Sequence, residues 1–298
     1  MSSLKEIKTR IASVKNTLKI TSAMKMVASA KLHKAQTAIG NKLPYEQTLH
    51  HILAGLLEDG DLQKALHDNL GFGNPHGHSA VVLEDVGLDQ IPSKDVYPRI
   101  AVVVISSNSS LCGAFNANVI KKYQETINIL ENQGYAKEDI DIYVIGRKIA
   151  EAVRKSGYTV LDDRSELADK PSYDAAFDLA SDLVDSFVSG EVSHVVLVYS
   201  HFASPASQPV IRENYLPLPL HDYDGTDGDP VDYILEPDPL SLVKHLLPQV
   251  LLVKLYTVLL DANAAEHAAR TLAMQIASDN AKDLIGELTL AYNQGRQQ

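Results

Sequence analysis

Three groups of residues in this 298-residue sequence have side chains that could support chemistry. The single cysteine, Cys112, could act as a nucleophile if the fold placed His194 or His201 beside it, because such groups need only meet in space. His76 and His78 lie in the segment NPHGHS with Asp and Glu residues nearby, and could bind a metal ion. The segment SSNSSLCGAFN follows an apolar run and precedes a helical pattern, the position of a phosphate-binding turn.

Each of these patterns also has an interpretation that involves no chemistry, and we favour it. A lone cysteine at a strand-to-helix junction is usually a small buried residue. Structural metal sites need four ligands at clear spacing, so the two histidines are better interpreted as part of a surface loop. The serine-rich turn lacks the glycine patterns of dinucleotide and P-loop sites. The sequence therefore predicts no catalytic residue, no cofactor site and no metal site.

The elements that would position these residues begin with a long basic helix. Apolar and small residues recur at alternating spacings of three and four, with only two polar interruptions, Thr21 and Lys25. Such a heptad stripe predicts a coiled coil in which the polar positions either set the register or face another protein. Pro44 is expected to kink or interrupt this helix before it continues to about Leu57. The stripe comprises Leu4, Ile7, Ile11, Val14, Leu18, Thr21, Lys25, Ala28, Leu32, Ala35 and Ile39.

A second heptad stripe near the C-terminus offers a partner for the first. Its small residues would allow close approach, and the simplest topology is an antiparallel coil of the two ends of the chain. Pro248 is expected in the first turn of this helix. The predicted stripe is Leu251, Leu255, Val258, Ala262, Ala265, Ala269, Leu272 and Ile276, followed one residue out of frame by Ala277, Ala281, Leu284, Leu288 and Ala291. Such a slip would locally alter the supercoil.

The middle of the chain alternates between strand and helix patterns, which predicts a mostly parallel sheet in an α/β domain resembling a Rossmann fold. The expected strands are 100–105, 141–145 and 194–199, with 207–215 as an antiparallel edge, and the expected helices are 115–131, one from Arg147, and 173–187. The expected divisions are a first coil helix over 1–57, an acidic loop-rich insertion over 58–98 with a local helix near 62–67, the α/β domain over 99–216, an acidic Pro-rich loop over 217–239 and a second coil helix over 240–298.

The charge is divided unevenly along the chain. Residues 1–42 carry nine Lys or Arg and one Glu, whereas the whole chain has a net charge of −11. A basic helix could bind DNA, but zipper proteins separate the basic region from the heptads, and here the lysines flank the stripe throughout. We therefore expect no nucleic-acid partner. The composition also excludes a disulfide scaffold and a membrane-spanning protein.

Four segments resemble one family, the gamma subunit of F-type ATP synthases. The block IKTRIASVKNTLKITSAMKMVASAKLHKA is similar to the N-terminal signature of that family, and EHAARTLAMQIASDNAKDLIGELTLAYNQGRQ is similar to its C-terminal signature. SSNSSLCGAFN and DYILEPDP resemble two internal segments in the same order. The departure in the first of these is Ser110, where the family usually has glycine before Leu-Cys-Gly. A single cysteine argues against the thiol-switched chloroplast type.

The resemblance implies a central rotor shaft with no catalytic site of its own, in a proton-translocating ATP synthase. It implies that the shaft stands inside a hexamer of alpha and beta subunits, while the α/β domain contacts the epsilon subunit and the ring of c subunits. The implied location is the cytoplasmic face of a bacterial inner membrane, with the membrane reached only through partners. The implied rotor-to-stator contacts are Met24, Lys25, Glu266, Arg270, Arg296 and Gln297.

The same resemblance raises an expectation about the first turns of the N-terminal helix. Family members usually continue past the terminal RQ, and that extension runs beside the start of this helix. We therefore expect Leu4, Ile7, Ile11 and Val14 to lack an intramolecular partner and to drive self-association. The leading alternative for the whole protein is an α/β nucleotide-binding enzyme with a coiled-coil appendage, which would turn over a small substrate alone.

Overall fold

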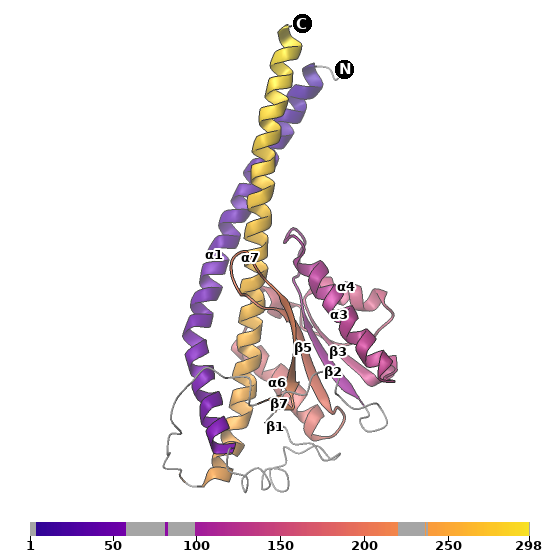
Figure 1. Ribbon diagram of the computed structural model, residues 1–298, viewed down its shortest axis with the longest axis vertical. Helices are drawn as coiled ribbons and strands as arrows, with labels where there is room; N and C mark the ends of the chain where they lie inside the picture. The colour runs from indigo at the N-terminus through magenta and orange to yellow at the C-terminus, as the bar shows by residue number, and fades with distance from the viewer. Residues whose placement is uncertain (1–3, 58–80, 83–98, 220–235, 237, 298) are drawn as a thin grey trace.

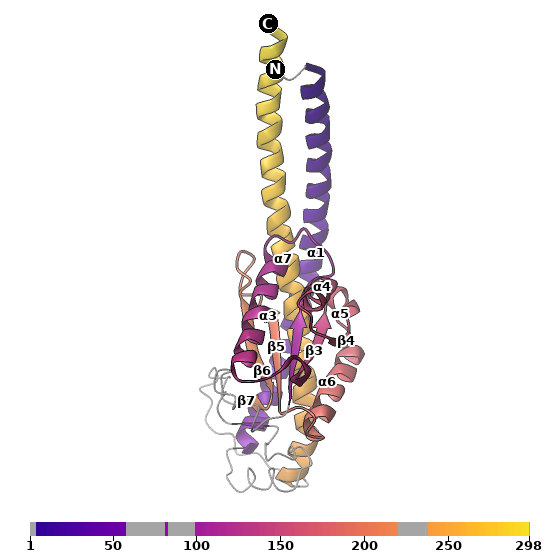
Figure 2. The same cartoon turned by 90° about the vertical axis from the view of Figure 1, so that its right-hand side faces the viewer.

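The computed structural model describes residues 4–57, 81–82, 99–219, 236 and 238–297. Two long antiparallel helices form a rod, and an α/β domain lies beside the lower half of that rod (Figure 1). Both ends of the chain lie at the far tip of the rod, as the second view also shows (Figure 2). The predicted fold class, a mostly parallel sheet domain with a coil of the terminal helices, is confirmed.

The main sheet has five strands in the order β4-β3-β2-β5-β6. Strands β2 to β5 are parallel, and β6 pairs antiparallel with β5 at the edge, as the sequence predicted. A separate short parallel pair joins β1 to β7. The bounds are β1 Val81–Val82, β2 Ile100–Ile105, β3 Ile140–Ile145, β4 Val160–Asp163, β5 His194–Ser200, β6 Val210–Leu216 and β7 Leu218–Pro219.

Side chains alternate between the two faces of the sheet, and each face has its own apolar core. Ile100, Val102 and Val104 of β2 pack with α3 (Phe115–Asn132) and α4 (Arg147–Lys155). Ala101, Val103 and Ile105 face the opposite way, toward α6 (Tyr173–Val188) and the long helix α7 (Pro239–Gln297). The lower part of α7 is therefore a core helix of the α/β domain as well as half of the coil.

One glycine fixes how two neighbouring strands end. Gly146 joins β3 to α4 with φ +113°, and a Cβ there would lie 2.4 Å from the carbonyl oxygen of Ser106. The Ser106 amide donates a hydrogen bond to Ile145 O at 2.7 Å, and its hydroxyl accepts one from the amide of Ile149 at 3.0 Å. Only glycine allows this close approach, which brings the serine turn against the start of α4.

Both long helices run through their prolines, so the expectations of an interruption at Pro44 and of Pro248 in a first helical turn were wrong. Helix α1 is continuous over Leu4–Leu57 despite Pro44, and Pro248 lies well inside α7, whose first residue is Pro239. Proline removes the hydrogen bond to the carbonyl four residues earlier. Pro44 and Gly40 are both exposed, as are Pro248 and Lys244, so water can bind the freed carbonyl groups. Packing on the opposite faces of both helices keeps them intact.

The sequence patterns missed two short elements of the α/β domain. Strand β4 is half-exposed and ends in two aspartates, and α5 (Glu166–Asp169) is a single turn. Neither is long enough to show a clear apolar period. The local helix expected near 62–67 lies outside the described residues.

Candidate functional site

The structure does not bring Cys112 together with either histidine. Cys112 is buried, and its sulfur accepts a hydrogen bond from the side-chain amide of Asn116 at 3.2 Å within its own turn. His194 lies at the start of β5, opposite Ile100, whereas Cys112 follows the far end of β2. His201 Nδ1 lies 2.7 Å from an oxygen of Asp261 on α7. These contacts favour a structural role for all three residues.

Of the other two patterns, only the serine turn lies within the described residues. His76 and His78 lie outside the described residues. In the described parts of the chain, no three His, Cys, Asp or Glu side chains gather where they could hold a metal ion. The serine turn holds itself together: the amide and the hydroxyl of Ser107 lie 3.1 and 3.0 Å from Asn116 Oδ1. Its left-handed residues are Leu111, with φ +68°, and Gly113, with φ +61°, so the departure at Ser110 needs no unusual backbone.

The position where an open α/β sheet usually binds a ligand is covered by α7. Ligands bind such sheets outside the carboxyl ends of the strands. Here the turns that follow β2 and β5 are hydrogen-bonded to Arg270 and Asp261 of α7. A Cβ placed on Gly113 would lie 3.7 Å from the Cβ of Ala273. This arrangement argues against the nucleotide-binding alternative and identifies the coil as the functional element.

The coil has two regions with different surroundings. We call α1 residues 4–28 and α7 residues 271–297 the upper coil, because above Ala273, which approaches Gly113, these two helices project from the α/β domain (Figure 2). The remainder, which consists of the α/β domain and the lower parts of α1 and α7 that pack on it, is the base. The predicted stripe of α1 is buried or partly buried along both regions, except Leu4, which is 40% exposed. The sequence interpretation of the first helix is therefore confirmed.

The predicted stripe of α7 was only partly right in the upper coil: Ala281 and Leu288 lie on the contact stripe, but three other predicted residues are exposed, namely Leu272, Ile276 and Ala291. Leu272 and Ile276 are 40% and 52% exposed, whereas Met274, Ser278 and Ala281 are buried. The contact stripe comprises Thr271, Met274, Ser278, Ala281, Ile285, Leu288, Tyr292 and Gly295, all buried or partly buried at heptad spacing. It needs no slip of frame.

The error has a physical cause, since α7 has two partners in the base. The predicted positions 251 to 269 face the sheet domain, where Leu251, Leu255 and Ala265 are fully buried. Helix α1 packs on another face, through Ala264 and Ala268. Above the domain only the face toward α1 stays covered, so residues that continue the sheet-facing stripe become exposed.

Polar pairs connect the two helices of the upper coil. The hydroxyls of Thr21 and Ser278 are buried and lie 2.8 Å apart. Lys25 Nζ donates a hydrogen bond to Gln275 Oε1 one turn lower. Both interruptions of the first stripe therefore meet a polar partner on α7, which favours their interpretation as residues that set the register.

The first turns of α1 do have an intramolecular partner, contrary to expectation. Helix α7 continues to Gln297, and Leu4 Cδ2 would lie 3.2 Å from a Cβ placed on Gly295. Ile7, Ile11 and Val14 are partly buried. The uncovered seam proposed as a cause of self-association is therefore absent from the described part of the coil.

The six expected contact residues fall into two groups. Met24 and Lys25 are partly buried in the upper coil, and Arg296 and Gln297 are exposed at its tip. Glu266 and Arg270 lie at the top of the base instead, with side chains only 11% exposed. Arg270 Nε donates to Glu266 Oε1 at 3.0 Å, Nη1 to Ser110 O at 2.6 Å and Nη2 to Ser109 Oγ at 2.9 Å. Sequence reasoning gave no sign of this internal bonding.

The Glu266 carboxylate is held in its charged form. Burial alone would raise the pKa of Glu266, but the hydrogen bonds and charges of His267 and Arg270 outweigh burial, so the pKa lies below its ordinary value. Glu266 and Arg270 are four residues apart on α7, the favourable order for a helical ion pair. Glu266 thus orients Arg270 toward the serine turn.

Helix α7 is long and apolar enough to cross a membrane by composition alone, but 61% of its most apolar window is buried inside the chain. This burial matches the core-helix role described above. The helix therefore gives only weak evidence of a membrane span.

Comparisons with known proteins agree with this architecture. A family described as ATP synthase matches residues 3–298. The ATP synthase gamma chain of Phocaeicola vulgatus is 47% identical, and that of Bacteroides fragilis is 48% identical, each over 100% of this chain and 95% of the relative. Among solved structures, the fold resembles that of a chain in the rotor of the Euglena gracilis mitochondrial ATP synthase, with a TM-score of 0.61 and 18% sequence identity. The match covers 99% of this chain and 97% of the Euglena chain. The chain belongs to the ATP synthase gamma-chain family and is a central-stalk, non-catalytic subunit of that enzyme complex.

Proposed function

We propose that the upper coil turns inside a ring of alpha and beta subunits, while the base meets the epsilon subunit and the c ring. The shape of the coil carries this proposal. From residue 271 to residue 297, α7 extends about 40 Å at 1.5 Å per residue, accompanied by α1 and approached by the serine turn only at Ala273. A slender two-helix rod fits inside a ring of subunits and can turn there. The location proposed for the complex is the cytoplasmic face of a bacterial inner membrane.

The positive charge of α1 favours an acidic inner surface on the subunits that would surround the upper coil. Lys8, Lys15 and Lys19 are exposed along this helix, and Glu6 is the one acidic residue among positions 1–42. A basic rod is attracted to an acidic inner surface, and diffuse charge attraction permits sliding better than fixed apolar contacts do.

The six expected contact residues differ in how accessible they are to a partner subunit. Arg296 and Gln297 are exposed at the tip and free to meet a surrounding subunit, and Met24 and Lys25 are partly accessible. Glu266 and Arg270 are nearly covered, so a partner would reach only their edges. We propose all six as rotor-to-stator contacts and expect the four residues of the upper coil to dominate.

Reconstitution with alpha and beta subunits tests the proposed function. The full chain should assemble with them and raise ATP hydrolysis from almost nothing. A purified chain that bound ATP tightly and hydrolysed it unaided would instead support the enzyme alternative.

A charge reversal tests the basic flank. The double change Lys15→Glu and Lys19→Glu should weaken assembly about tenfold or more, because it removes attraction and adds repulsion. Lys121→Glu, at an exposed lysine on α3, is the matched control and should assemble normally. Equal assembly of both variants would rule out an electrostatic role for the flank.

A further inference from the structure

Three side chains of α7 tie the helix to three separate turns of the α/β domain. Asp261 accepts a hydrogen bond from the amide of Phe202 at 3.0 Å and contacts His201, both after β5. Asn263 Nδ2 donates to the carbonyl of Ala168, at the end of α5, at 2.8 Å. Arg270 binds Ser109 and Ser110 after β2. We call Asp261, Asn263 and Arg270 the clasp.

The clasp holds α7 on two sides. At 100° per residue, Asn263 and Arg270 point in nearly the same direction, and Asp261 points almost opposite to them. Between these directions lies the stripe of alanines that faces the sheet domain, including Ala265 and Ala269. Bonds on both flanks of this stripe oppose a roll of the helix in either direction. Alanine methyl groups alone form no directional bond.

The clasp also lies where the helix leaves the domain. Below it, Leu251 and Leu255 are fully buried in the core, and above it α7 packs on α1, with one further approach of Gly113 to Ala273. A rod that is loaded at its tip bends and twists about the last point at which it is held. Arg270 is the uppermost of the three ties, and Glu266 keeps its guanidinium in place through a hydrogen bond of 3.0 Å.

We propose that Asp261, Asn263 and Arg270 are positioning residues that transmit torque from the α/β domain into the coil. This inference rests on the proposed rotary function and adds a residue-level account of how the base drives the shaft. The residues touch no substrate; they fix the angle between the α/β domain and α7. Under this proposal Glu266 and Arg270 also have a role inside the chain, in addition to any contact with a partner.

The expected effect follows from the free length of the rod. Without the Arg270 tie, the highest remaining tie is Asn263, so the free part of α7 lengthens from about 40 Å to about 51 Å. Twist under a given torque is proportional to free length. Arg270→Ala should therefore increase the twisting fluctuation of the shaft about 1.3-fold. The combined loss of Asp261 and Arg270 leaves the free length unchanged but should increase the fluctuation further, because Asn263 then holds only one flank of the helix.

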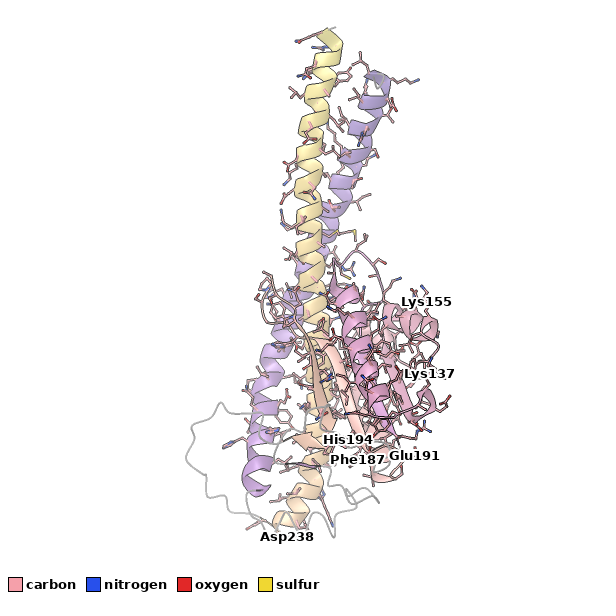
Figure 3. All side chains as sticks on the ribbon, turned by 45° about the vertical axis from the view of Figure 1, so that its right-hand side comes forward. Lys137, Lys155, Phe187, Glu191, His194 and Asp238 are labelled. Atoms are coloured by element: carbon pink, nitrogen blue, oxygen red, sulfur yellow. The ribbon has the colours of Figure 1, made fainter. Side chains whose placement is uncertain are left out.

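The experiment uses the complex with alpha and beta subunits fixed to a surface and a bead attached to the base. Lys155 lies on the outer side of the α/β domain, away from the coil, and a cysteine placed there by Lys155→Cys provides the attachment (Figure 3). The native Cys112 is buried and does not compete. The angular variance of the bead during a pause in rotation reports shaft stiffness.

Arg154→Ala is the matched control, because the ion pair of Arg154 with Asp163 lies wholly inside the α/β domain. It should leave the variance unchanged, whereas Arg270→Ala should raise it. If Arg270→Ala assembles poorly, Arg270→Lys takes its place. This variant keeps the charge but has fewer hydrogen-bond donors, so its variance should lie between that of the wild type and that expected for Arg270→Ala.

The outcomes separate the two levels of inference. If the wild-type complex does not rotate the bead during ATP hydrolysis, the proposed function fails. If it rotates, but the Arg270 and Asp261 variants have the variance of the control, the clasp has no mechanical role and this inference fails. A variance that rises in Arg154→Ala as well would also overturn it, since the effect would not be specific to the clasp.

Discussion

The base and the upper coil are built from the same two helices, yet they are stabilised differently. In the base, α7 is surrounded by apolar side chains from the sheet, α6 and α1. In the upper coil it has one neighbour, and that contact includes a hydroxyl pair and a lysine-to-amide hydrogen bond. The comparison teaches that one continuous helix can be a rigid core element at one end and a lightly held, accessible rod at the other.

The largest expected difference concerns apolar truncation. Leu251→Ala removes a fully buried side chain in the base and should lower the free energy of unfolding by about 3 kcal/mol. Leu288→Ala, at a partly buried position of the upper coil, should cost about 1 kcal/mol, because water already reaches the site. Urea denaturation of the full chain, followed by circular dichroism, measures both. Similar costs would show that the upper coil is packed as tightly as the base.

Two glycines sharpen the comparison through opposite signs. Gly146→Ala should destabilise the base by about 2 kcal/mol or more, because φ is +113° and the new methyl meets Ser106 O. Gly286→Ala lies on an exposed face of the upper coil with nothing within 4 Å of the new methyl, and should stabilise the chain by about 0.5–1 kcal/mol. Thermal unfolding of both variants gives the two shifts. A loss at Gly286 would mean that this face is not free.

The hydroxyl pair of the upper coil should have a moderate effect. Thr21→Val leaves Ser278 buried without its partner and should cost about 1 kcal/mol. Adding Ser278→Ala should recover most of that loss, because neither polar group then remains unsatisfied. A double-mutant cycle by urea denaturation measures the coupling. Additive losses would indicate that the two hydroxyls do not interact.

The smallest expected effect is the pH dependence of the Glu266 pair at the boundary between the two regions. Its pKa is lowered from the ordinary value of 4.5, so its contribution to stability is complete above that value and is lost as the pH falls through the lower, folded-state pKa. The groups that favour its charge are His267 and Arg270. The stability difference between wild type and Glu266→Gln should therefore shrink on acidification below about pH 4.5. A difference that stays constant down to pH 3 would contradict a lowered pKa.

The α/β domain could be predicted well from local patterns, because each of its main elements satisfies one simple requirement. Strands β2 and β5 are buried on both faces and appear as unbroken apolar runs. Helices α3 and α6 show one apolar face each. The half-exposed strand β4 escaped notice because its burial is not continuous.

The sequence by itself determined the long helices and indicated their pairing, since heptad spacing can be recognised without knowing the neighbours. The family followed from the resemblance of four segments to its known signatures. Only the tertiary structure decided which face of α7 meets α1. Leu272 and Ile276 extend an apolar stripe that the sheet domain uses lower down, and spacing cannot reveal where that domain ends. The clasp was hidden for the same reason: Asp261, Asn263 and Arg270 bind groups that lie 59 to 161 residues away in the chain.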